Sequence, residues 1–401
     1  MFFILPFIFS LAGLIITLKI LIGYNPEFSF RRKISIASLL VLAWFGPTFC
    51  GLIRWKKLLP ELPGIYVSQG LHILFVSACF LMIILLLRDF LWMNGYKIAK
   101  KCGKDRFEYD PMNPAAIKKA NVYTVFLVCL LSVYSLYEGL KFPALKETEI
   151  STEKVEESFK IVVLTDTHIT AATPVPKVEK LVKTVNDLKP DITVLIGDIA
   201  DGKPAFVEKQ MEVLTGLDAK YGVFVTLGNH EFYHGSVEWE NKFKKMRLFY
   251  LANEGLNLSG TNIFLSGLPD PQLLHLNSVG MELVKGVLKT AKEGSYRIFL
   301  SQSPRFIRRL DNDLIDLQIS GHTHGGQIFP FHYLVKRFND FLAGLYDVDG
   351  MKLYVSRGAG SWGPPMRLFA PSEISVITLV PSEKQEGVGG ERILTKERQP
   401  I

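Results

Sequence analysis

The sequence predicts two regions of different class: an all-α transmembrane region in the N-terminal third, and after it an α/β domain with two packed sheets. Two observations carry this prediction. Long apolar runs without charge are concentrated before residue 140, whereas short β-rich runs, most of them followed by a polar motif, recur after residue 158. The length of 401 residues allows two or three domains, so the division fits the size of the chain.

Four runs lack any charged side chain, at residues 1–18, 34–53, 65–87 and 120–137. Runs of about 18 or more such residues are typical of membrane-spanning helices, and four in succession favour spans over buried helices of a soluble core. The first run has no basic segment before it and no clear small-residue cleavage site after it, so we expect it to remain attached. The sequence therefore predicts about four transmembrane helices within residues 1–140.

Lys and Arg residues in the loops predict the orientation. With four spans, the loop that holds Arg31, Arg32 and Lys33 lies on the same side as the strongly basic stretch 97–119, and the opposite loop carries three basic residues within 54–57. The positive-inside rule then places the C-terminal domain outside the cytoplasm. The loss of one span from the count would reverse this orientation.

Composition predicts the remaining domain boundaries and the binding partners of the chain. The charged stretch 141–158 is expected to be a linker, residues 159–382 to form the α/β domain, and the charged tail 383–401 to be disordered. The net charge of +7 does not indicate a nucleic-acid partner, because much of it lies in membrane-flanking loops, where Lys and Arg attract anionic lipids. Membrane lipids are therefore the expected partner. The oligomeric state is left open.

Five polar motifs each follow a short apolar run: Asp166-Thr-His168, Gly197-Asp198, Gly228-Asn229-His230-Glu231, Ser301-Gln302-Ser303-Pro304 and Gly321-His322-Thr323-His324-Gly325-Gly326. This order places the motifs on loops just beyond the C-terminal ends of strands, where open α/β sheets collect their ligands. Apolar residues at helical spacing between 178 and 188 add a strand–helix–strand unit, and further strands are expected at 263–268, 352–356 and 374–380. We expect the motifs to converge on one site.

Carboxylate, imidazole and amide side chains on converging loops suit a pair of divalent ions, with Mn, Fe or Zn favoured over Mg. All four cysteines precede residue 150, so the domain offers no thiolate ligand and no disulfide framework. Two ions about 3.5–4 Å apart clamp a phosphate and lower the pKa of a shared water towards about 7, which makes a hydroxide nucleophile at neutral pH. The pattern predicts a metal-dependent hydrolase of phosphoester bonds.

The motifs resemble those of the calcineurin-like metallophosphoesterases, whose pattern is Asp-x-His, Gly-Asp, Gly-Asn-His-Glu, a lone His and Gly-His-x-His. The resemblance extends over about 160–380. The stretches 357–360 and Trp362-Gly-Pro-Pro-Met-Arg367 resemble a membrane-linked or exported bacterial branch of that family. The resemblance implies a four-layer α/β/β/α sandwich, two divalent metals, attack by a metal-bound hydroxide, and a location in a bacterial inner or cell membrane.

The resemblance also implies roles for single residues: Asp166, His168 and His324 at the first metal, Asp198 between both, Asn229 and His322 at the second, and His230 beside the phosphate as stabiliser or general acid. One position departs from the family pattern, because Gln302 stands where many relatives have a further His. A glutamine oxygen is a weaker donor to transition metals than imidazole, so we expect Gln302 to make the second metal site looser.

Two residues outside the ligand set need an interpretation. Arg367 lies in the matched Trp-Gly-Pro-Pro stretch, and a cation close to two metals is a candidate for binding the substrate phosphate. His234 follows the third motif but belongs to no motif itself, so we expect it to be an ordinary surface histidine.

The function predicted from the sequence is that of a membrane-anchored phosphoesterase acting on a phosphomonoester, phosphodiester or pyrophosphate. The membrane attachment and the nearby Phe329, Phe331 and Phe338 favour a lipid-linked or envelope substrate such as a phospholipid, although these aromatics also suit a core or a membrane contact. One alternative is cleavage of UDP-2,3-diacylglucosamine in lipid A synthesis, which needs a site facing the cytoplasm. A second alternative is a non-catalytic membrane sensor with a degenerate site.

Overall fold

The structure is a computed structural model that describes residues 4–23, 25, 27–56, 58–104, 110–270, 276–382 and 395–397. The chain forms two compact units. The first comprises Met1–Tyr137 with Gly363–Met366, and the second comprises Glu138–Trp362 with Arg367–Ile401.

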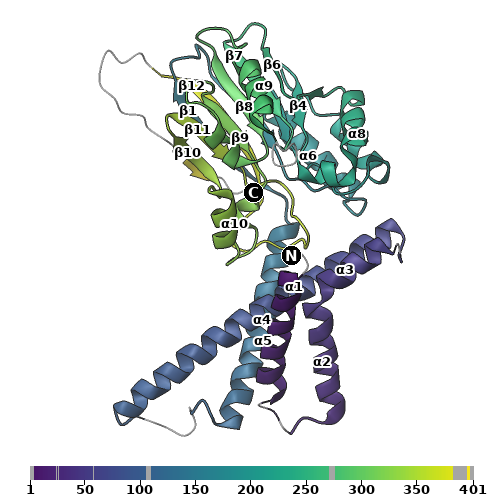
Figure 1. The fold of residues 1–401 in the computed structure, drawn as a ribbon, viewed down its shortest axis with the longest axis vertical. Coiled ribbons are helices and arrows are strands. Elements are labelled where there is room, and N and C mark those ends of the chain that lie inside the picture. Colours follow the sequence, from purple (N-terminus) through teal and green to yellow (C-terminus); the bar gives the residue numbers. More distant parts are fainter. Residues whose placement is uncertain are drawn as a thin grey trace. The chain divides into compact units, whose positions relative to one another are not determined.

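The N-terminal unit is helical and consists of α1 (Ile4–Leu18) with a short π-helical turn (Lys19–Gly23), α2 (Phe30–Trp44), α3 (Gly46–Trp55), α4 (Glu61–Lys101) and α5 (Pro114–Leu140) (Figure 1). Two of these helices, α4 and α5, are long and apolar enough to cross a membrane. Helices α2 and α3 would count as a third span if taken together, although the chain bends by 62° between them. The apolar segment Phe7–Gly23 is shorter than a full span.

Of the roughly four predicted spans, the described helices support two or three. The run 34–53 is broken because Gly46 and Pro47 follow α2, and proline cannot continue the hydrogen-bond ladder of a preceding helix. Helix α1, from the first run, passes into the π-helical turn that starts at Lys19.

Small residues and buried polar groups hold this unit together. A Cβ atom on Gly13 would lie 2.3 Å from the ring of Trp44, so glycine is required for α1 to approach α2. The Trp44 indole donates to Thr17 Oγ1 at 3.2 Å. Arg88 on α4 donates through Nη1 to Asn121 Oδ1 at 2.7 Å on α5. Close packing and interhelical hydrogen bonds of this kind are how helices associate where lipid removes the hydrophobic driving force.

The second unit contains two sheets (Figure 1). The seven-stranded sheet has the order β13-β1-β12-β2-β3-β4-β5, built from β1 (Ala144–Thr152), β2 (Phe159–Leu164), β3 (Ile192–Ile196), β4 (Val223–Thr226), β5 (Phe249–Tyr250), β12 (Glu373–Pro381) and β13 (Thr395–Glu397). The six-stranded sheet has the order β10-β11-β9-β8-β7-β6, built from β6 (Glu254–Asn257), β7 (Ile263–Leu268), β8 (Tyr296–Ser301), β9 (Leu317–Ser320), β10 (Gly344–Val348) and β11 (Met351–Val355).

Three apolar clusters produce four layers. Side chains of both sheets interdigitate in a central core that includes Ile161 and Ile319. The outer face of the first sheet packs against α6 (Val175–Asp187), α7 (Glu208–Leu214) and α8 (Asn229–Lys245). The outer face of the second packs against α9 (Ser278–Leu288) and the 3₁₀ turn Pro304–Arg309. The predicted α/β/β/α sandwich is confirmed.

One boundary differs from the expectation. The stretch 141–158, expected to be a linker, contains β1, which pairs in parallel along its whole length with β12. Only three residues therefore separate the end of α5 at Leu140 from the first strand at Ala144. Most of the tail 383–401, expected to be disordered, lies outside the described residues. Its described segment, β13, pairs with β1.

The strand order explains why the motifs meet. Strands β2, β3 and β4 are parallel neighbours, so the loops that follow them lie at one edge of the first sheet. Strands β8 and β9 are parallel neighbours in the second sheet. The carboxyl ends of all five strands thus deliver the five motifs to one end of the sandwich.

Candidate metal centre

The loops that carry the motifs are held in an uncommon backbone conformation. Five non-glycine residues have positive φ: Asp166 (51°), His168 (44°), Asp198 (50°), His322 (71°) and His324 (51°). Such residues cost free energy and persist where the surrounding structure determines them, which is common at functional sites. Close approach also requires glycines, because a Cβ atom on Gly321 would lie 2.2 Å from Asp166 Oδ2.

Asp166, His168 and His324 form the first half of the site. Their ligand atoms lie within 4.8 Å of one another, and all three residues are buried. The Nε2 atoms of His168 and His324 are 3.0 Å apart, and Asp166 Oδ1 lies 3.7 Å from His324 Nε2. Burial and the neighbouring His168 lower the pKa of His324 well below its usual range, so this ring is neutral, as a metal ligand has to be.

Asp198 lies between this group and the next, with Oδ2 3.9 Å from His168 Nε2. Its Oδ1 accepts a hydrogen bond from the backbone N–H of His230 at 2.8 Å. Burial, reinforced by the nearby Glu231, raises the pKa of Asp198 well above the usual value. A buried carboxylate in such surroundings is stabilised by a cation.

Asn229, His322 and Gln302 form the second half. Asn229 Oδ1 lies 3.0 Å from His322 Nδ1. The Gln302 side chain is fully buried, and its Oε1 accepts from the backbone N–H of Asn229 at 3.0 Å while its Nε2 donates to Asp166 Oδ1 at 3.3 Å. Gln302 is thus tied to both halves, and its carbonyl oxygen already has a partner.

The donor set fits a pair of divalent ions. Two aspartates, three histidines and an asparagine supply carboxylate, imidazole and amide donors, which suit Mn, Fe or Zn. Two imidazole nitrogens facing each other at 3.0 Å beside a carboxylate are stable when a cation or a proton lies between them. A buried cluster of this composition is therefore one that a metal would complete.

Comparison with known proteins decides the family. Residues 159–326 match the model of the calcineurin-like phosphoesterases. An uncharacterized metallophosphoesterase of Campylobacter jejuni is 38% identical over 258 residues, which cover 62% of this chain and 68% of that protein. One of Helicobacter pylori is 36% identical over 263 residues, covering 65% and 70%. The chain belongs to the calcineurin-like phosphoesterase family.

As a member of this family the protein is a phosphoesterase hydrolase, and its family depends on two metal ions. It is also similar to a protein of Bos taurus described as a transmembrane protein with metallophosphoesterase domain, at 29% identity over 331 residues that cover 78% of this chain and 72% of that protein. This similarity and the two or three apolar helices indicate a membrane protein.

In this phosphoesterase, Asp201 connects two of the site histidines. Its carboxylate lies 3.1 Å from His168 Nδ1 and forms a short hydrogen bond with His230 Nδ1. Burial acts to raise the pKa of Asp201, but the two histidines outweigh it and lower the pKa well below the usual range. A carboxylate on the far nitrogen of a histidine orients the ring and leaves Nε2 for a ligand or a substrate.

Glu231 fixes the conformation of the loop that carries Asp198. It is fully buried, and its carboxylate accepts hydrogen bonds from four backbone N–H groups: those of Asp198 (2.9 Å), Ile199 (2.7 Å), Ala200 (3.1 Å) and Gly228 (2.8 Å). Burial raises the pKa of Glu231, and these donors oppose that shift. Glu231 therefore ties the second motif to the third.

Arg367 does not lie where a substrate-binding cation was expected. Its side chain is fully buried, and the guanidinium donates to the backbone oxygens of Gly360 (3.0 Å), Arg357 (2.8 Å) and Ala370 (2.8 Å). It also approaches His324 Nδ1 at 3.1 Å. Burial lowers the pKa of Arg367 to about 10. The residue supports the ligand loop from behind, and the substrate-binding interpretation does not fit this position.

The structure brings the predicted ligands together, and their roles at individual metals stay predictions. Sequence reasoning missed Asp201, although it lies only three residues after Asp198, and assigned no role to Glu231. The ring of His234, expected at the surface, is within 4.8 Å of ligand atoms of Asp201 and His230.

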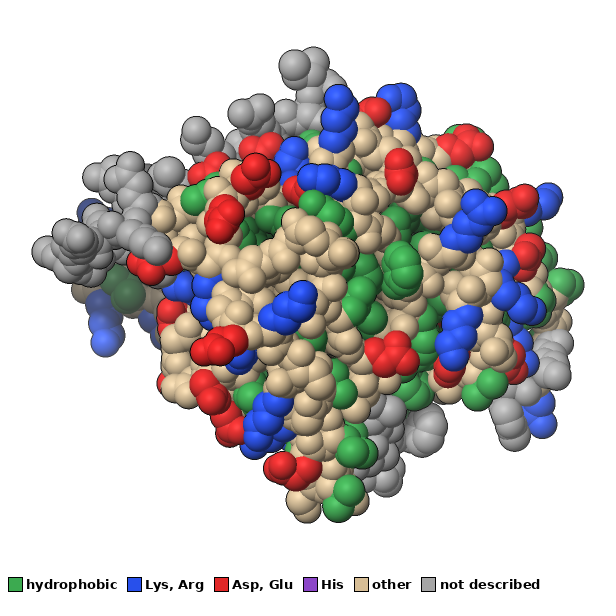
Figure 2. Space-filling model, turned by 90° about the horizontal axis from the view of Figure 1, so that it is seen from above, with side chains coloured by type: hydrophobic (Ala, Val, Ile, Leu, Met, Phe, Trp, Pro, Cys, Tyr) green, Lys and Arg blue, Asp and Glu red, His purple; other side chains and the backbone are tan. Residues whose placement is uncertain are grey.

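On the face shown in Figure 2, acidic and basic side chains are intermixed, and no histidine is visible among the described residues.

Proposed function

We propose that the protein is a membrane-anchored, two-metal phosphoesterase that hydrolyses an amphiphilic phosphoester or pyrophosphate, such as a lipid or another envelope component. One observation carries the proposal. A buried set of carboxylate and imidazole donors occupies a domain whose first strand begins three residues after the last apolar helix. Such a domain works beside a bilayer, where amphiphilic phosphoesters are concentrated.

Each residue of the site has a definite task in this proposal. Asp166, His168 and His324 would hold one divalent ion, Asn229 and His322 would hold the other, and Asp198 would contribute to both. The ions, Mn, Fe or Zn, supply charge that polarises the phosphoester and activates water. His230, oriented by Asp201, would donate a proton to the departing oxygen.

The revised span count supports a site outside the cytoplasm. If the first apolar segment drops out and α2 with α3 makes one span, Arg31, Arg32 and Lys33 still share a side with the basic stretch around Lys97 and Lys119. The positive-inside rule then gives the same orientation as before, because the lost span precedes every basic loop. We propose an extracytoplasmic site in a bacterial cell membrane.

The test compares one phosphoester in two physical forms. The full chain, purified in nanodiscs with added Mn, is assayed on a soluble short-chain phosphodiester and on the same headgroup carried by a bilayer lipid. We expect a higher kcat/KM for the bilayer form and no turnover after chelation. Equal or better turnover of the soluble form would contradict the amphiphilic substrate.

Two other outcomes would replace the proposal. Cleavage of UDP-2,3-diacylglucosamine, together with protection of a cysteine introduced at Ser158 from external thiol label in spheroplasts, would establish the nucleotide-lipid alternative. Failure to bind metal and to cleave any phosphoester would establish a non-catalytic sensor.

A further inference from the structure

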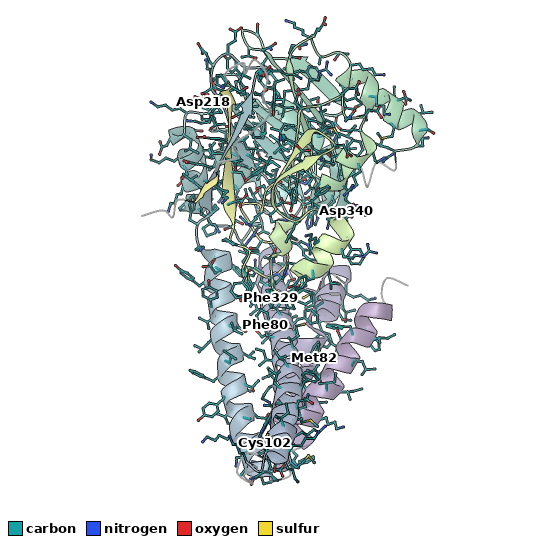
Figure 3. All side chains as sticks on the ribbon, turned by 90° about the vertical axis from the view of Figure 1, so that its left-hand side faces the viewer. Phe80, Met82, Cys102, Asp218, Phe329 and Asp340 are labelled. Atoms are coloured by element: carbon teal, nitrogen blue, oxygen red, sulfur yellow. The ribbon has the colours of Figure 1, made fainter. Side chains whose placement is uncertain are left out.

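A cluster of large apolar side chains is exposed beside the metal-binding loops. It comprises Phe329 (39% exposed), Tyr333 (67%), Leu334 (55%), Phe338 (68%) and Phe369 (74%), and we call it the aromatic surface. Three of its members belong to the short helix α10 (His332–Asn339), in which none of the residues is buried. Figure 3 labels Phe329 and, just beyond the end of this helix, Asp340. Several exposed apolar side chains gathered beside one another are typical of an interaction site.

The aromatic surface is one structure, because ring contacts and backbone bonds connect its segments. The Phe329 ring lies 6.3 Å from that of Tyr333 and 5.7 Å from that of Phe369, measured between centroids. The Phe329 N–H donates to Leu368 O at 3.2 Å. Leu334 and Phe338, four residues apart on α10, share one side of the helix. These contacts hold the aromatic side chains in their exposed positions.

The aromatic surface is also joined directly to the metal-binding loop. Gly326, two residues after His324, has φ 81°, and a Cβ atom there would lie 2.3 Å from the Cβ of His332. Helix α10 therefore starts in contact with the loop. Gln327 then bridges to the Trp362 backbone, accepting from its N–H at 2.9 Å and donating to its oxygen at 2.8 Å.

Basic residues border the aromatic surface. Lys336 and Arg337 are exposed on α10 between the apolar positions, and Arg305 and Arg308 lie at its end. Asp340 is the acidic group beside them, and it pairs with Arg305 at 3.2 Å and with Arg308 at 3.3 Å. A helix with exposed aromatic and aliphatic side chains next to Lys and Arg has the composition of one that lies in a membrane interface.

We propose that the aromatic surface binds the headgroup layer of an anionic bilayer. Tyr333, Phe338 and Phe369 would enter the boundary between headgroups and acyl chains, where aromatic side chains are favoured, and Lys336 and Arg337 would contact lipid phosphates. The proposal concerns an interaction surface, so it stands independently of whether the substrate is a lipid.

The short connection to the membrane helices favours lipid as the partner of the aromatic surface. The three residues 141–143 span at most about 11 Å, whereas a domain of this size has a radius of gyration of about 18 Å. Some part of the domain surface is therefore always close to the headgroups. The charge of this surface matches an anionic leaflet.

Site-specific photocrosslinking of the full chain tests the proposal without relying on activity. Benzoylphenylalanine replaces Phe338 in one variant and Val279 in another, and each protein is reconstituted as a single copy in nanodiscs of anionic lipid. Val279, on α9, is the matched control because it is exposed to almost the same extent, 67% against 68%. After irradiation, intact-protein mass spectrometry counts lipid adducts.

We expect a lipid adduct at position 338 that exceeds the adduct at position 279 by at least about fivefold, and a similar fall at 338 when Lys336→Gln and Arg337→Gln are added or when the lipid is zwitterionic. Equal adducts at the two positions, or no adduct at 338, would overturn the proposal. Protein–protein crosslinks at 338 that appear only with two copies per disc would assign the surface to a second chain. Tyr333→benzoylphenylalanine repeats the test if the 338 variant fails to fold.

Discussion

The two halves of the candidate metal centre offer different kinds of ligand. The first half consists of Asp166, His168 and His324, all buried, with two imidazole nitrogens 3.0 Å apart. The second half consists of Asn229 and His322, with the amide of Gln302 behind them. Charged side chains support both histidines of the first half: Asp201 lies on the far nitrogen of His168, and Arg367 donates to the backbone oxygen of His324.

If each half holds one ion as proposed, this difference predicts that the two ions bind with unequal strength. A carboxylate and two oriented imidazoles bind a transition metal better than an amide and a single imidazole. The second half depends on Asp198 for its negative charge. Changes to the shared residues should therefore damage both halves, and changes to the supporting residues should damage one.

Asp198→Asn should have the largest effect, because it removes the carboxylate that we propose is shared by both halves. We expect kcat to fall by at least about 1,000-fold while the fold is retained, since an amide fills the same volume. Phosphodiesterase assays with saturating Mn, combined with metal analysis and circular dichroism, provide the measurement. Activity close to wild type would refute the shared-ligand role.

Glu231→Gln should damage the scaffold of both halves. An amide directs its NH₂ group towards backbone N–H donors, so at least one of the four donors that Glu231 satisfies loses its partner. We expect a loss of about 3 kcal/mol in the free energy of unfolding, or a Tm lower by about 6–12 °C, with or without metal. The control is Glu208→Gln, an exposed residue paired with Lys242, which should leave Tm unchanged.

Arg367→Met should weaken the first half selectively. The change leaves the backbone oxygens of His324, Gly360, Arg357 and Ala370 without the guanidinium donor, so the loop that carries His324 loses its support. We expect the affinity for the tighter ion to fall by about 10–100-fold, with Arg367→Lys only a partial rescue because an ammonium cannot reproduce the planar fork. Calorimetric titration measures both ions, and the exposed Arg305→Met serves as control. Equal weakening of the two ions would contradict the division into halves.

The ligand set could be predicted from the sequence because each motif directly follows a strand, and parallel strands bring their ends together. The supporting residues could not. The sequence around Arg367 does not distinguish a buried arginine from one that faces the substrate. Arg367 is buried because backbone segments distant in the sequence, at residues 324 and 357–360, together with residue 370, surround its side chain. Asp201 was missed for a similar reason: its two histidine partners lie on loops of different strands.

The layers of the fold could likewise be predicted from the sequence, whereas the place of strand β1 and the break between α2 and α3 could not. The sandwich follows from apolar runs at strand and helix spacing, whereas β1 has the charged sequence ALKETEIST and lacks an apolar pattern of its own. Its place in the sheet is decided by pairing with the buried β12, which is a long-range effect. The bend of 62° between α2 and α3 was not predicted, because Gly46 and Pro47 do not alter the apolar character of a run but do interrupt a helix.

Gln302→His should have the smallest effect, and it acts on the second half. It introduces the imidazole that the family pattern implies at this position, a stronger donor than an amide oxygen, but removes the bonds to the Asn229 N–H and to Asp166. We expect these changes to offset each other in part, so that retention of the weaker ion during mild chelation improves by about three- to tenfold. Metal analysis against dialysis time measures this, with the tighter ion as internal control. If wild-type protein loses both ions at the same rate, the second half is not the weaker one, and Gln302 supports an ion as well as a histidine would.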